Sequence, residues 1–171
     1  MSPAVTPRVV DAGPEHLEAI ASIYAEVVRS SPATFDVEPP GRGWWEDVLA
    51  HVDQGKGHLL LVALGADDAV LGYVKTGTFK EKAAYSTTCE VSIHIADDAR
   101  GQGVGTALYA VLLERLERTP LRLAVAGITE PNPASVALHR AFGFDRVGTF
   151  EDVGVKFGRP WSVTWYQRRL G

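Results

Sequence analysis

The sequence contains a single cysteine. Cys89 is the only one among 171 residues, so no disulfide can form within the chain. No cluster of cysteine and histidine has the spacing of a structural zinc site either. We therefore expect neither a disulfide nor a bound metal, and a protein suited to the reducing cytoplasm.

Long apolar runs and runs of basic residues are also missing. Nowhere do about 18 apolar residues follow one another, and the first ten residues lack the apolar core of a signal peptide. The formal net charge is -4 and the sequence pI is about 5.7, and no stretch of Lys or Arg could follow a phosphate backbone. We expect no membrane span, no signal peptide and no nucleic-acid partner.

What the chain does have is enough apolar material for a continuous core. Its hydrophobic content is 46%, and its length lies within the usual range of one domain. No repeat, low-complexity tract or linker divides it. We predict one domain over residues 1–171, whose function must come from sites on that domain.

Hydrophobic periodicity predicts the order strand, two helices, three strands, helix, strand, helix, two strands. This order indicates an α/β (α+β) fold with a mixed sheet. The predicted strands cover 8–11, 58–64, 70–79, 90–95, 122–128, 145–150 and 162–169, and the predicted helices cover 14–30, 44–52, 103–117 and 134–142.

A glycine-rich loop, Arg100-Gly-Gln-Gly-Val-Gly105, joins the strand 90–95 to the helix that follows. Glycines let the backbone approach an anion closely, and the first N–H groups of a helix favour phosphate oxygens. Arg100 can add charge-assisted hydrogen bonds. Neither a Walker loop nor a dinucleotide fingerprint fits the spacing. The alternative is a helix start that only packs tightly.

A second motif, Asn132-Pro-Ala-Ser135, opens the helix that ends before Gly143-Phe144. A purely structural role as a helix cap is the alternative for Asn132 or Ser135. His139 lies within this helix. An imidazole can hold or lend a proton near neutrality, but a histidine packed under the sheet is the alternative.

The two motifs together resemble the GNAT superfamily of acyl-CoA-dependent N-acetyltransferases. The resemblance implies a single GNAT domain with a central mixed, mostly antiparallel sheet flanked by helices on both faces. It also implies acetyl-CoA as cosubstrate and no metal. Under this resemblance, the loop grips the pyrophosphate and the region of Asn132 contacts the pantetheine arm. The predicted cofactor-binding residues are Ile93, His94, Ile95, Arg100, Gly101, Gln102, Gly103, Val104, Gly105, Thr106, Asn132 and Ser135.

Further segments narrow the resemblance to phosphinothricin N-acetyltransferases, a group that includes enzymes acting on methionine sulfoximine and methionine sulfone. It implies direct transfer of acetyl, within a ternary complex, to the primary amine of a small amino-acid-like acceptor, and a homodimer. The segments that carry it are Phe35 in Thr-Phe-Asp-Val-Glu-Pro, Trp45, Gly77-Thr-Phe-Lys80 with Tyr85, the Glu90 strand and Val155-Lys-Phe-Gly-Arg159.

Two side chains have catalytic roles under this resemblance. Glu90 is the predicted general base, because an ammonium has no lone pair with which to attack. A carboxylate needs burial or a relaying water to be an effective base, and a solvated acid at a strand end is the alternative. His139 stands where many GNAT enzymes have a tyrosine that protonates the departing thiolate. A backbone amide near Ile93 to Ile95 could stabilise the tetrahedral intermediate.

The acceptor side rests on less specific signals. Cationic, hydroxyl and aromatic side chains suit an amino-acid-like ligand, but each is also compatible with a surface position. The predicted substrate-binding residues are Phe35, Phe79, Lys80, Tyr85 and Lys156. A protein N-terminus, a polyamine or an aminoglycoside are alternative acceptors, and a CoA-binding module without catalysis is an alternative function. We expect Cys89 to be a small strand residue rather than a nucleophile.

Overall fold

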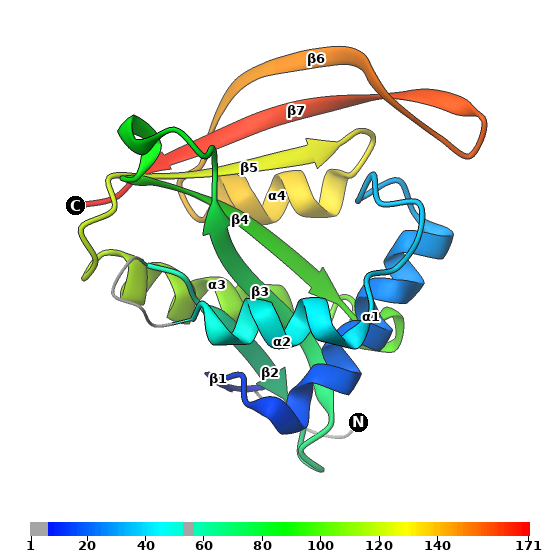
Figure 1. Cartoon of the computed structure of the whole chain (residues 1–171), viewed down its shortest axis with the longest axis vertical. Helices are drawn as coiled ribbons and strands as arrows, with labels where there is room; N and C mark the ends of the chain where they lie inside the picture. Colours follow the sequence, from blue (N-terminus) through cyan, green and yellow to red (C-terminus); the bar gives the residue numbers. More distant parts are fainter. Residues whose placement is uncertain (1–6, 53–56) are drawn as a thin grey trace.

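The computed structural model describes residues 7–52 and 57–171. Their seven strands form one sheet in the order β1-β2-β3-β4-β5-β7-β6 (Figure 1). Every neighbouring pair is antiparallel except β4 and β5, which are parallel. The first six residues, where no signal peptide was expected, lie outside the described residues. The strands are β1 (Arg8–Asp11), β2 (Leu60–Leu64), β3 (Val70–Thr78), β4 (Thr88–Ile95), β5 (Leu123–Thr129), β6 (Asp145–Lys156) and β7 (Arg159–Arg169).

Helices cover both faces of the sheet. α1 (Leu17–Ser30) and α2 (Arg42–Ala50) pack on one face, and α3 (Val104–Leu116) and α4 (Pro133–Ala141) pack on the other. Strand β2 shows the consequence, since all five of its residues are buried. Leu61 and Ala63 join the α3 core, while Leu60, Val62 and Leu64 join the α1 core. Among the helices described, none is long and apolar enough to cross a membrane.

The predicted fold class and the predicted order of elements are confirmed. Most predicted boundaries lie within two residues of the observed ones. The remaining differences arise because helix and strand ends depend on local caps that periodicity does not specify. Three short 3-10 turns, at Pro14–His16, Ala83–Tyr85 and Asp97–Ala99, complete the described elements.

The hairpin of β6 and β7 is longer than the sequence predicts. We expected a break over 151–161, but the strands continue to Lys156 and restart at Arg159. Phe157 and Gly158 form the turn with positive φ angles of 54° and 72°, the conformation of a type I′ hairpin. Pro160 pairs only with β6, because the ladder between β5 and β7 ends at Val163, so proline is tolerated there.

Strands β4 and β5 separate soon after they pair. Their parallel ladder has three residue pairs, the last of which joins Glu90 to Val125. Each strand then continues along its other neighbour, β4 along β3 and β5 along β7. Figure 1 shows the two strands starting together and moving apart, so a gap opens inside the sheet beyond Glu90.

The hairpin also holds the segment between α1 and α2 in place. Lys156 is 4% exposed, and its Nζ donates hydrogen bonds of 2.8 Å to the carbonyl oxygens of Ser31 and Thr34. Phe35 lies against Gly154, where a Cβ atom would come within 2.2 Å of Cε2 of the Phe35 ring. We call these contacts the loop clamp. They bring residues 31–35 against a strand more than a hundred positions away in sequence.

Replacing Lys156 by Met should loosen the loop clamp. The variant loses both hydrogen bonds and leaves two carbonyl groups without their donor, so we expect the free energy of unfolding to fall by roughly 1–3 kcal/mol. Urea denaturation measures the change, and proteolysis should cut the segment 31–41 faster. Lys82→Met, at an exposed site, serves as the control. Equal stability of the two variants would contradict the clamp.

Candidate functional site

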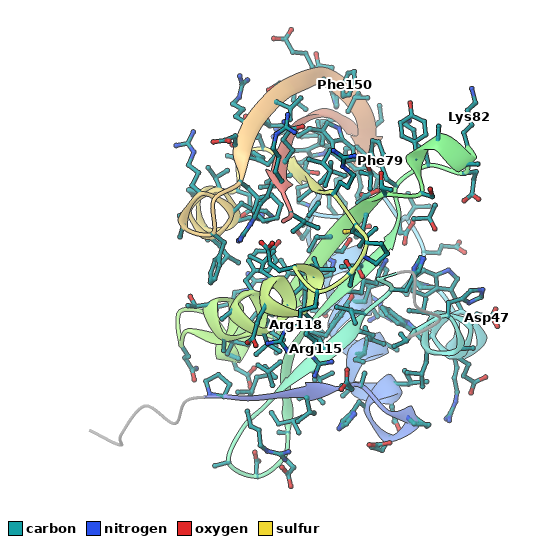
Figure 2. The ribbon with its side chains drawn as sticks, turned by 90° about the vertical axis from the view of Figure 1, so that its left-hand side faces the viewer. Asp47, Phe79, Lys82, Arg115, Arg118 and Phe150 are labelled. Carbon is teal, nitrogen blue, oxygen red and sulfur yellow. The ribbon has the colours of Figure 1, made fainter. Side chains whose placement is uncertain are left out.

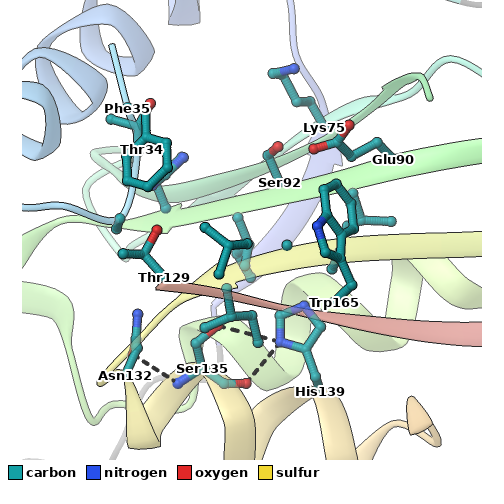
Figure 3. A pocket seen from close by; sticks show the side chains of 18 of the residues that line it. Thr34, Phe35, Lys75, Glu90, Ser92, Thr129, Asn132, Ser135, His139 and Trp165 are labelled. Atoms are coloured by element: carbon teal, nitrogen blue, oxygen red, sulfur yellow. Dashed lines mark hydrogen bonds between the residues drawn. The ribbon is translucent and has the colours of Figure 1, made fainter. Parts of the chain in front are cut away.

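A cavity of about 560 Å³ lies where β4 and β5 separate (Figure 3). Its walls come from α1, α2 and the segment between them, from β3 to β7, and from α4. A second cavity, of about 690 Å³, lies beside the glycine-rich loop. The two cavities adjoin each other, since they share the lining residues Ala33, Ile93, His94, Asn132 and Ser135. A ligand in the second cavity could therefore extend into the first.

The glycine-rich loop has the backbone geometry of an anion site. Gly101 and Gly103 have φ angles of 74° and 79°, which glycine adopts without strain. Gly103 is the N-cap of α3 and provides no side-chain cap, so the first N–H groups of the helix remain available to a ligand. No atom lies within 4 Å of a Cβ built at either glycine. The loop is therefore open where a phosphate would approach.

Nearly all of the predicted cofactor-binding residues line this second cavity, and Gln102 is the exception. The Gln102 side chain turns back and donates to the carbonyl oxygen of Asp98 at 2.6 Å. Arg100 lines the cavity and pairs with Asp97 at 2.7 Å on the surface. Its guanidinium would have to share or leave this exposed pair to reach an anion.

The open edge of β4 presents backbone amides to the gap. The N–H of Ala96 donates to the carbonyl of Leu71 on β3. Because successive residues of a strand direct their N–H groups to opposite sides, Ile95 and Ile93 direct theirs toward β5. The ladder with β5 has already ended there. These amides therefore have no β5 partner, and their donation to a ligand stays a prediction.

Helix α4 forms the wall opposite Glu90 (Figure 3). Asn132 caps the helix, since its Oδ1 accepts a hydrogen bond from the N–H of Ser135 at 3.1 Å. His139 is 2% exposed. Its Nδ1 lies 2.7 Å from the carbonyl oxygen of Ser135, and its Nε2 lies 2.6 Å from the hydroxyl of Tyr109. Nδ1–H therefore donates to Ser135, and Nε2 accepts from Tyr109.

Burial lowers the pKa of His139, so the neutral imidazole with two satisfied nitrogens is the stable form. Burial also lowers the pKa of His94 to about 4. The His94 ring packs against Tyr24 and Tyr73. Both histidines line the first cavity as uncharged groups at neutral pH.

Glu90 lies at the point where the two strands separate. It forms the last pair of the ladder with β5, and its antiparallel partner on β3 is Gly77, which has no side chain to cover it. Burial raises the pKa of Glu90, and the ammonium groups of Lys75 and Lys80 oppose part of this rise. A half-buried carboxylate with a raised pKa is a stronger base than an exposed one.

The structure divides the predicted substrate-binding residues. Phe35 lines the first cavity. Lys80 and Tyr85 line a separate pocket of about 340 Å³. Phe79 packs edge-on against Tyr85 and against Trp165, which does line the cavity. Lys156 lies in the loop clamp instead of the cavity wall, because its ammonium bonds to backbone carbonyls.

Several cavity residues were not predicted from the sequence, among them Tyr24, Trp44, Lys75, Ser92 and Trp165. Alternation along β3 and β4 carries the signal for two of them. Lys75 faces Ser92 in the ladder and stands two residues from Gly77, which faces Glu90. The side chains of Lys75, Ser92 and Glu90 therefore share one face of the sheet. The signal becomes usable only when the register of the two strands is known.

Two other residues have structural positions. Trp45, one of the residues that carried the resemblance, is 1% exposed and packs between Tyr24 and Tyr73, while its neighbour Trp44 reaches the cavity. Cys89 is buried in the α3 core, and burial raises the pKa of its thiol to about 12. A thiol with that pKa is a poor nucleophile. Among the described residues, no three His, Cys, Asp or Glu side chains are grouped to hold a metal.

Comparison with known proteins gives consistent relatives. The model of the acetyltransferase (GNAT) domain matches residues 11–165. The chain is 40% identical to a phosphinothricin N-acetyltransferase of Streptomyces coelicolor, covering 91% of this chain and 92% of the relative. It is 36% identical to an L-methionine sulfoximine/L-methionine sulfone acetyltransferase of Pseudomonas aeruginosa, covering 94% and 92%.

Among solved structures, the chain is similar to a GNAT superfamily phosphinothricin acetyltransferase from Sinorhizobium meliloti in complex with AcCoA. The TM-score is 0.92 and the identity is 35%, and the match covers 98% of this chain and 90% of that one. The resemblance stated from the sequence is confirmed by these comparisons.

Replacing Gly103 by Val should weaken the binding of acetyl-CoA, the ligand that the sequence predicts for this loop. A β-branched residue is strained by roughly 1–3 kcal/mol at this φ, and the relaxed loop would move its amides. We expect the Kd, measured by calorimetry, to rise about tenfold or more.

Gly143→Val is the matched control, because Gly143 has a φ of 76° and equally open surroundings but lines neither cavity. Both variants should lose similar stability. An unchanged Kd in Gly103→Val, or an equal rise in Gly143→Val, would contradict the assignment of the loop.

Proposed function

The chain belongs to the GNAT family and is an acetyl-CoA-dependent N-acetyltransferase, and on that premise we propose that it acetylates the primary amine of a small amino-acid-like acceptor. The acceptor is of the phosphinothricin, methionine sulfoximine or methionine sulfone type. The observation that carries this proposal is the first cavity, which Glu90 and Phe35 line and which adjoins the cavity at the glycine-rich loop. Its volume suits a small molecule.

The residues of the second cavity fit acetyl-CoA. The open N–H groups after Gly103 suit a pyrophosphate, and the shared lining residues Asn132 and Ser135 lie where a pantetheine arm would pass to the first cavity. When bound, acetyl-CoA supplies the activated acetyl group as a thioester. The amide of Ile93 is placed to donate to a carbonyl oxygen that gains negative charge, a contribution of a few kcal/mol in other acyl transfers.

Glu90 takes the proton of the acceptor's ammonium, either directly or through water, so that the amine can attack. Its raised pKa matches this task better than an ordinary carboxylate would. For His139 to act as the acid predicted from the sequence, its ring has to release the bond to Tyr109 or Ser135 and take up a proton that burial disfavours. The geometry also supports a role for His139 in holding Ser135 and the start of α4 in place.

We further propose that residues 1–171 form one GNAT domain that acts as a homodimer in the cytoplasm. Exposed apolar side chains along the β6–β7 hairpin are compatible with self-association, since exposed apolar surface can mark an interface or a ligand site, and two of them, Phe150 and Val153, also line the first cavity. The exposed apolar side chains of the hairpin are Val147, Phe150, Val153, Val155 and Phe157, each more than half exposed. Figure 2 shows Phe150 on the hairpin at one end of the molecule.

A panel of amines tests the proposed acceptor. We expect kcat/KM, measured from the release of CoA thiol, to be higher for phosphinothricin, methionine sulfoximine or methionine sulfone than for a peptide N-terminus, a polyamine or an aminoglycoside. A margin of roughly tenfold corresponds to about 1.4 kcal/mol of transition-state binding. Activity confined to the peptide, polyamine or aminoglycoside would contradict a small amino-acid-like acceptor.

Replacing Glu90 by Gln tests the base. Loss of a general base typically costs 10²–10⁴-fold, so kcat should fall by about that factor while the Kd for acetyl-CoA is retained. In the wild type, kcat should decrease as the pH falls through the raised pKa of Glu90, because the protonated carboxyl cannot accept a proton. That acidic limb should be missing in the variant. Glu81→Gln, at an exposed site, is the control, and a wild-type kcat in Glu90→Gln would remove Glu90 from the mechanism.

A further inference from the structure

The first cavity contains one lysine and no arginine among the described residues that line it. Lys75 comes from the middle of β3 and lies on the same side of the cavity as Glu90 and Ser92 (Figure 3). It is half-buried. The lysine that the sequence predicts for substrate binding, Lys80, lines a different pocket. Lys75 is therefore the positive charge that an acceptor in this cavity would meet.

The ammonium of Lys75 forms no close ion pair with a described carboxylate, although Glu90 and Asp36 act on it at longer range. No ion pair or hydrogen bond joins it to a described side chain, and its contact is with the ring of Trp44, 5.7 Å from Nζ to the centroid. Buried cations elsewhere in the chain are satisfied, as Lys156 is by two carbonyl groups. Desolvation lowers the pKa of Lys75, and the carboxylates of Glu90 and Asp36 oppose only part of this fall, so the burial of the ammonium is incompletely compensated. An anionic ligand would relieve this cost.

The register of β3 and β4 sets the spacing of the two charges. Lys75 pairs with Ser92, and Gly77 pairs with Glu90, so Lys75 and Glu90 are diagonal neighbours on one face. Such positions lie about 7–8 Å apart across the two strands, and the long side chain of lysine can shorten the distance between the two charges. An α-amino acid carries its ammonium and carboxylate on one carbon. Its two charges thus match the carboxylate of Glu90 and the ammonium of Lys75.

We propose that Lys75 binds the carboxylate of the acceptor and thereby selects amines that have an anionic group beside them. The proposal rests on the proposed function, because it needs an amino-acid acceptor. It assigns to Lys75 the discrimination against peptide amines and polyamines, which lack a carboxylate next to the amine. Glu90 then receives the ammonium end of the same molecule.

The test compares one acceptor with its carboxamide. Methionine sulfone and methionine sulfone amide differ at the group that Lys75 is proposed to bind. For Lys75→Met we expect the ratio of kcat/KM for the acid over the amide to fall roughly 10- to 100-fold, the loss of one charge-assisted hydrogen bond. The loss should appear in KM. Lys75→Arg should recover part of the ratio, because it restores the charge.

Two lysine variants complete the comparison. Lys82→Met should keep the wild-type ratio, since Lys82 is exposed and does not line the first cavity. Lys80→Met tests the other candidate. A ratio that falls in Lys80→Met and not in Lys75→Met would overturn the proposal. The proposal would also be overturned if Lys75→Met lost kcat equally for the acid and the amide and had a shifted pH profile. That result would mean that Lys75 acts only through Glu90.

The outcomes also separate this proposal from the proposed function. If the wild type acetylates methionine sulfone and Lys75→Met has the same acid-to-amide ratio of kcat/KM, the role of Lys75 is overturned and the proposed function stands. A wild type that acetylates no amino acid overturns both. Unfolding curves for each variant show whether a lost activity reflects a lost fold.

Discussion

The parallel pairing of β4 and β5 lasts for three residue pairs and then ends inside the protein. From Val91 onward, one edge of β4 has no strand beside it, although buried backbone groups without partners each cost about 1–3 kcal/mol. The fold accommodates this edge by placing cavities along it instead of packed side chains. Acetyl-CoA and an acceptor can then meet at one point, because the gap joins the two sides of the sheet.

The gap stays open because each of its strands is held from the outside. β4 pairs with β3 over seven residue pairs, and β5 pairs with β7 over seven. Behind these ladders, the core around Leu108 and Leu112 fixes α3 against the sheet, and Trp45 with Tyr73 fixes α2 on the other face. Such close-packed interiors deform little. Glu90 and His139, the proposed catalytic groups, therefore hold their spacing without direct bonds to each other.

More of the residues predicted for the donor side than for the acceptor side line the two cavities, for a physical reason. The loop from Arg100 to Thr106 is a local structure, and its glycines and the following helix are adjacent in the chain. The acceptor side is assembled from distant segments, so its composition depends on register and long-range contacts. Lys75 could not be assigned to the cavity without knowledge of the pairing of β3 and β4. Lys156 has an ammonium group that could bind an anionic ligand, but in the fold this group donates to two backbone carbonyls. The strand extension over 151–161 was not predicted because the glycines and the proline there are typical of loops, although they form part of a type I′ hairpin.

The loop clamp has a consequence for the order in which the protein is made. Residues 31–35, near the start of the chain, reach their positions by bonding to Lys156 and packing on Gly154, near its end. The same segment lines both cavities, since Ala33 lies in the wall of each and Ser31 in the wall of the second. Neither half of the site is therefore complete before the C-terminal hairpin has been synthesised.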